Sequence, residues 1–66
     1  MIVVMRENYT NDDLDKVVNY IEHNGLKTSI FKDDDSCRVG MLGNTYNISI
    51  NELDNISGVY KLLKVD

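Results

Sequence analysis

The spacing of hydrophobic residues changes along the chain, and each change predicts a different element. The run Ile2-Val3-Val4-Met5 is apolar at every position, which is typical of a strand buried on both faces. Leu14, Val17, Val18 and Ile21 then recur every third or fourth residue, so they form one apolar stripe on a helix. The chain is therefore expected to begin with a strand and an amphipathic helix.

Both ends of this helix carry residues that commonly cap helices. Thr10 is a good N-cap, and Asp13, three positions later, completes a pair that resembles a capping box. Gly25 suits the left-handed conformation that ends many helices, and Leu26 would then contact Ile21 as in a Schellman motif. The helix is thus predicted to lie between Thr10 and Gly25.

Alternation of apolar and polar residues after Gly25 predicts strands at residues 26–32 and 37–42. The polar segment Asp33-Asp34-Asp35-Ser36 suits the turn of a hairpin between them. Residues 43–45 are expected to form a loop.

Residues 46–56 allow two interpretations. Polar residues alternate with Tyr46, Ile48 and Ile50, as in a strand, but Ser49 with Glu52 resembles a helix start. We favour a short helix at about residues 50–55. The break at Ser57-Gly58 then leaves a last strand at residues 59–65.

The order strand, helix, strand, strand, helix, strand is that of the ferredoxin-like βαββαβ fold. We therefore expect a single α+β domain over residues 1–66, in which two helices cover one face of a four-stranded antiparallel sheet. The other face of the sheet would be left open.

Composition excludes several classes of function. Cys37 is the only cysteine, so an internal disulfide and a cysteine-rich zinc site are both excluded. The net charge of −4, with basic residues scattered singly, argues against nucleic-acid binding. No apolar run is long enough to cross a bilayer, and there is no signal-peptide pattern, so a cytoplasmic location is expected.

The polar residues that could carry chemistry have simpler structural interpretations. Adjacent carboxylates at Asp33, Asp34 and Asp35 point to alternate sides of an extended chain, so we expect a solvated tip and no metal site. His23 would interact with the negative end of the helix dipole, and Cys37 would be a small buried apolar residue. No catalytic set is recognised and no cofactor is expected, which favours binding or regulation over catalysis.

An apolar patch is predicted on the open face of the sheet, and such patches mark interfaces. The helices are expected to cover Ile2, Val4, Ile30, Val39 and Met41. The patch would then consist of Val3, Met5, Phe31 and Leu42. Because a chain of 66 residues seldom builds a strongly stabilising core, we expect it to associate with itself through this face.

Several segments together resemble a known family. They are Met1 to Met5 with Thr10 to Leu14, Val17-Val18, Ile21-Glu22, Gly25-Leu26-Lys27, Val39 to Gly43, and Ile56 to Leu63. In order and spacing they look like the N-terminal ferredoxin-like domain of one group of DAHP synthases, the first enzymes of the shikimate pathway. The resemblance extends over nearly the whole chain.

The resemblance implies a regulatory module similar to the ACT domains that sense amino acids. In that family the domain packs against a counterpart on another subunit, and an aromatic amino acid bound between them inhibits some members. The positions matching the ligand contacts are Ser29 and Phe31. The family's catalytic (β/α)₈ barrel of about 250 residues is a further partner, and none of it lies in this sequence. A plain oligomerisation or protein-interaction module without a small ligand is the alternative.

Overall fold

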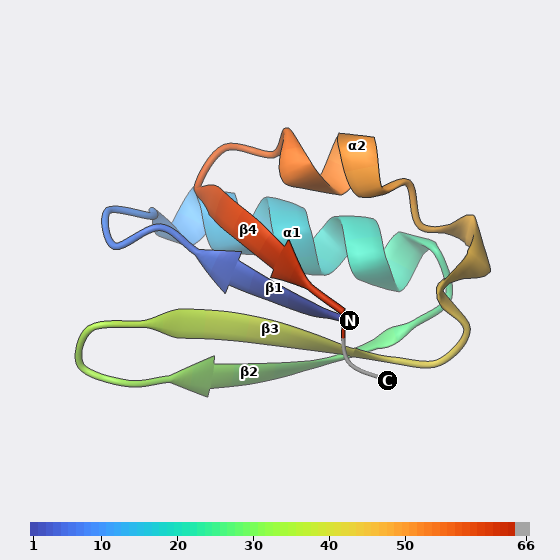
Figure 1. Cartoon of the computed structure of the whole chain (residues 1–66), viewed down its shortest axis with the longest axis horizontal. Coiled ribbons are helices and arrows are strands. Elements are labelled where there is room, and N and C mark those ends of the chain that lie inside the picture. The colour runs from blue at the N-terminus through green and yellow to red at the C-terminus, as the bar shows by residue number, and fades with distance from the viewer. Residues whose placement is uncertain (65–66) are drawn as a thin grey trace.

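The first strand of the chain lies in the interior of the sheet. β1 (Ile2–Met5) pairs on one side with β3 (Cys37–Leu42) and on the other with β4 (Val59–Leu63). β2 (Lys27–Lys32) pairs with β3, which gives the order β2-β3-β1-β4 with every neighbour antiparallel. Our structure is a computed structural model that describes residues 1–64 (Figure 1). The predicted ferredoxin-like α+β fold is confirmed.

Helix α1 (Asn11–His23) begins and ends at the predicted caps. The backbone N–H of Asp13 donates to Thr10 Oγ1 at 3.1 Å, and the N–H of Thr10 donates to Asp13 Oδ2 at 3.0 Å. At the other end Gly25 has φ of 84°, and the N–H of Leu26 donates to the carbonyl oxygen of Ile21 at 3.3 Å. The capping box and the Schellman ending are both confirmed.

Helix α2 (Ile50–Asp54) confirms the helical interpretation of this segment. Ser49 caps it, because its side chain accepts a hydrogen bond from the N–H of Glu52 at 3.3 Å. The Tyr20 hydroxyl of α1 joins the two helices: it accepts from the N–H of Ser49 and donates to a carboxylate oxygen of Glu52, each at 3.0 Å. Both helices lie against the same face of the sheet (Figure 1).

A short 3₁₀ helix, η1 (Thr45–Asn47), was not predicted. It forms because the side-chain oxygen of Asn44 accepts a hydrogen bond from the N–H of Tyr46 at 3.0 Å. The final strand begins at Val59 as expected and ends at Leu63. The last predicted strand residue, Val65, lies outside the described residues.

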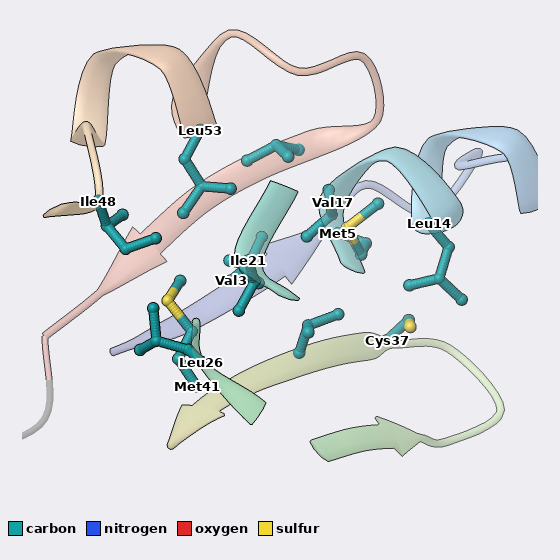
Figure 2. Packing of buried hydrophobic residues seen from close by; sticks show 12 residues of the cluster. Val3, Met5, Leu14, Val17, Ile21, Leu26, Cys37, Met41, Ile48 and Leu53 are labelled. Atoms are coloured by element: carbon teal, nitrogen blue, oxygen red, sulfur yellow. The ribbon is translucent and has the colours of Figure 1, made fainter. Parts of the chain in front are cut away.

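The core occupies the layer between the helices and the sheet, and Figure 2 shows its packing. Its buried apolar side chains are Val3, Met5, Leu14, Val17, Ile21, Leu26, Cys37, Val39, Met41, Ile48, Leu53 and Val59. Within residues 1–64, no helix is long and apolar enough to span a bilayer.

The prediction that Val3 and Met5 lie on the open face is wrong. Their side chains are 0 % and 4 % exposed and belong to the core (Figure 2). Val3 is directly opposite Val39, which faces the helices as predicted, so β1 must turn Val3 the same way. Ile2 and Val4 therefore occupy the open face.

Candidate functional site

The sheet face that no helix covers is the candidate site, and we call it the open face. Directly opposed residues of neighbouring strands share a face, so the strand register identifies its members. Ile2, for example, lies opposite Gly40 on one side and Leu63 on the other. The open face consists of Ile2, Val4, Lys27, Ser29, Phe31, Arg38, Gly40, Leu42, Lys61 and Leu63.

The two residues predicted to contact an effector lie together on β2. Ser29 is opposite Gly40, and Phe31 is opposite Arg38. A Cβ at Gly40 would fall 3.5 Å from the Phe31 ring and 3.9 Å from the Cβ of Ser29, so ring and hydroxyl-bearing side chain flank the glycine. The Phe31 ring therefore extends diagonally across the sheet toward Gly40.

Two of the predicted interface residues do lie on the open face. Phe31 is 58 % exposed and Leu42 is 59 % exposed. Leu42 is opposite Lys27 at the far end of the β2–β3 pair, whereas Phe31 is opposite Arg38. With Ile2 and Val4 in place of Val3 and Met5, apolar side chains extend over the open face of β1, β2 and β3.

An open hollow of about 630 Å³ lies beside Phe31. Its walls include Ile2, Phe31 and Arg38 from the open face, Lys32 at the end of β2, and Asp33 in the turn that follows. This volume is in the range of pockets that hold small organic molecules. The hollow offers an aromatic face and a guanidinium group to the same ligand.

Arg38 and Gly40 are site residues that the sequence reasoning missed. The alternation within Cys37–Leu42 does place both on the same side as Leu42. Only the pairing of β3 with β2, however, brings Arg38 opposite Phe31.

The pairing of β1 with β4 is irregular at one end of the open face. Its register shifts between Val4 and Met5, so Tyr60 is an extra residue of β4. The guanidinium of Arg6 and the ammonium of Lys61 lie 5.9 Å and 5.6 Å from the centre of the Tyr60 ring. These distances suit cation–π interactions, which hold basic groups at the edge of the face.

The other polar candidates do not form a second site in the described part of the chain. Cys37 is buried, and its hydrogen bond to Tyr9, helped by desolvation, raises the pKa of the tyrosine. His23 is exposed in the last turn of α1, and Asp34 lies in the exposed turn between β2 and β3. Among residues 1–64, no three His, Cys, Asp or Glu side chains are grouped so as to hold a metal ion.

Comparison with known proteins identifies the same ferredoxin-like fold. A family model described as the DAHP synthase ferredoxin-like domain matches residues 1–66. The crystal structure of phospho-2-dehydro-3-deoxyheptonate aldolase (DAHP synthase) from Thermotoga maritima matches with a TM-score of 0.81 and 27 % sequence identity. That match covers 91 % of this chain and 18 % of the T. maritima chain. No curated protein matches the sequence.

The fold and its uncovered sheet face define a small domain of the ferredoxin-like class. The family match is more specific, because it spans the whole sequence. The chain belongs to the family of DAHP synthase ferredoxin-like domains. It spans about a fifth of the length of the solved DAHP synthase that it resembles.

Proposed function

We propose that this domain regulates a DAHP synthase by binding a small effector on its open face. The family match over residues 1–66 supports the connection with that enzyme. The share of the T. maritima chain that is matched supports a module beside a larger catalytic part. Under this proposal the aldol condensation takes place outside this domain.

The arrangement of Phe31, Arg38 and Ser29 is the observation that carries the proposal. Phe31 offers an exposed ring for stacking, and Arg38 directly opposite it offers a guanidinium that pairs well with a carboxylate. Ser29, directly opposite Gly40 and on the same strand as Phe31, offers a hydroxyl that both donates and accepts. An aromatic amino acid carries the groups that complement all three.

Calorimetric titration of the chain with tyrosine, phenylalanine and tryptophan tests this proposal. We expect saturable heat with at least one of them, and a higher melting temperature, because a ligand at 100 times its Kd adds about 2.7 kcal/mol of stability. Phe31→Ala and Ser29→Ala should weaken the binding. Tyr46→Ala is the matched control, since that ring is 91 % exposed on η1, outside the open face.

The proposal fails if none of the three amino acids gives heat or shifts the melting temperature. It also fails if Tyr46→Ala weakens binding as much as Phe31→Ala does.

The apolar character of the open face favours a second candidate, a protein-interaction or oligomerisation module without a small ligand. Ile2, Phe31, Leu42 and Leu63 all lie on this face, and the last three are exposed. Sedimentation of the chain over a range of concentrations tests self-association. A monomer at the highest concentration would count against it.

A further inference from the structure

Acidic and basic residues are separated between the two layers of the domain. Helices α1 and α2 carry six of the eleven acidic residues, Asp12, Asp13, Asp15, Glu22, Glu52 and Asp54. The open face carries Lys27, Arg38 and Lys61, and within residues 1–64 none of its positions is acidic. The residues of the open face are therefore positively charged within a chain of net charge −4, and the acids that border them include Asp33 and Asp35 of the turn between β2 and β3.

Each of these cations lies among apolar side chains. Arg38 is opposite Val4 on one side and Phe31 on the other. Lys61 is also opposite Val4, and Lys27 is opposite Leu42. The cross-strand neighbours of these three basic groups thus supply apolar surface and no carboxylate.

A surface that covers this face has to satisfy two requirements. It needs apolar groups to contact Ile2, Phe31 and Leu42, because burial of apolar area drives association. It also needs carboxylates, because desolvating Arg38 or Lys61 without an opposite charge is costly.

We propose that the open face docks a partner protein whose surface has an apolar centre bordered by carboxylates. Arg38, near the middle of the sheet, pairs with one carboxylate, and Lys61 on β4 and Lys27 on β2 pair with others at opposite edges. This surface spans all four strands, so it goes beyond the effector site, which needs only β2 and β3.

A second copy of this chain fits the requirement less well. Two open faces placed together would bring Lys27, Arg38 and Lys61 of both copies into one interface, against Asp33 at the border of each face. The helical layer of a second copy supplies acids, but the apolar stripe of α1, which includes Val17 and Ile21, is buried in its own core. Of the large apolar side chains on the two helices, only Ile50 of α2 is exposed, so the helical layer offers its carboxylates with little apolar surface.

The size of the domain indicates how strong the contact is. Its Cα atoms span 30 × 21 × 17 Å, so even its largest side is near the lower limit of specific interfaces, about 600 Å² from each partner. With little apolar area to bury, charge pairing contributes much of the affinity. The docking is therefore weak and sensitive to salt.

A titration followed by NMR tests the proposal on the isotope-labelled 66-residue chain. The probe is an amphipathic helical peptide with leucines on one side bordered by glutamates, and its control has glutamine at every glutamate. We expect the glutamate peptide to shift the amide signals of Val4, Arg38 and Lys61. The glutamine peptide should bind about tenfold more weakly, as should the glutamate peptide at high salt.

Two lysine substitutions provide a matched pair of variants. Lys61→Gln removes a cation from the open face, away from Ser29 and Phe31, and should raise the Kd of the glutamate peptide about threefold to tenfold. Lys16→Gln removes the same charge from α1 and should leave the Kd unchanged. Lys61 lies on β4, outside the proposed effector site on β2 and β3. The peptide can therefore fail to bind even if an aromatic amino acid binds, and it can bind even if no amino acid does.

Several results would overturn the proposal. One is the absence of binding, and another is equal affinity for the two peptides or equal effects of the two lysine variants. Tighter binding of a single-stranded oligonucleotide than of the glutamate peptide would show that the open face binds phosphate groups instead. Concentration-dependent broadening of the Arg38 and Lys61 signals in the free chain would show that the open face binds a second copy of the chain.

Discussion

The side chain of Asp13, in the first turn of α1, packs directly against the backbone of Gly58, just before β4. A Cβ atom at Gly58 would lie 2.6 Å from both the Cβ and Oδ2 of Asp13. The same carboxylate accepts the hydrogen bond from the N–H of Thr10 that caps the helix. One acidic residue thus fixes the start of α1 and its distance from the chain entering β4.

Gly58→Ala should be strongly destabilising. Gly58 has φ of 88°, and the added Cβ would overlap with Asp13. The left-handed conformation alone destabilises a residue that has a Cβ by about 1–2 kcal/mol. With the overlap added, the loss of unfolding free energy should exceed about 2 kcal/mol. Urea denaturation measures this loss.

Gly25→Ala is the matched control for that substitution. Gly25 has φ of 84°, but a Cβ there meets nothing within 4 Å. It should cost only about 1 kcal/mol, which corresponds to a melting temperature lower by about 4–8 °C. Equal losses at the two glycines would contradict the packing of Asp13 on Gly58.

Asp13 should make stability depend on pH. The hydrogen bond from the Thr10 backbone lowers the pKa of the carboxyl below its ordinary value of 3.8, outweighing desolvation. The contribution is therefore fully present above pH 3.8 and is lost as the pH falls through the lower folded-state pKa. Asp13→Asn keeps an acceptor but removes the titration.

Urea denaturation of both proteins at about pH 6 and about pH 2.5 checks this sign. The stability advantage of the native chain over Asp13→Asn should shrink at the lower pH. An advantage that stays constant or grows on acidification would show that the Asp13 pKa is not depressed.

Tyr20→Phe should loosen the contact between the two helices. The substitution removes the hydroxyl that accepts from the N–H of Ser49 and donates to Glu52. Leaving the partly buried N–H of Ser49 without its acceptor should cost about 1 kcal/mol. Hydrogen exchange of that amide should become faster, while the amides of β2 should keep their rates.

Val3→Ala and Val4→Ala together test the direction of β1. Val3 is in the core, so its truncation should cost about 2–3 kcal/mol, including the cavity. Val4 lies on the open face, so Val4→Ala should lower the free energy of unfolding by less than about 1 kcal/mol. Melting temperatures of the two variants give the comparison, and the reverse order would restore the original assignment of the faces.

Elements with local signals were predictable from the sequence. The capping pair of Thr10 and Asp13, the glycine at 25 and the cap at Ser49 each depend on residues close in the chain, and the structure has all of them. The direction of β1 was not predictable in this way. Because Ile2-Val3-Val4-Met5 is apolar at every position, alternation gives no choice of side, and pairing with Val39 decides it.

The candidate site was only partly predictable for a related reason. The resemblance identified Ser29 and Phe31, and the structure places them on one face. The separation of acidic and basic residues between the two layers could not be predicted from the sequence, because basic residues that are isolated in the chain become neighbours only through strand pairing. Arg38 and Lys61 are far apart in the chain, yet both lie opposite Val4.

The interior position of β1 has a consequence for how the protein is made. β1 leaves the ribosome before β4, yet Ile2 is paired with Leu63 of β4. At about 5–20 residues per second, the apolar segment waits seconds for its second neighbour. During translation Ile2–Met5 therefore remains without its β4 partner, and the sheet is completed only when β4 has emerged.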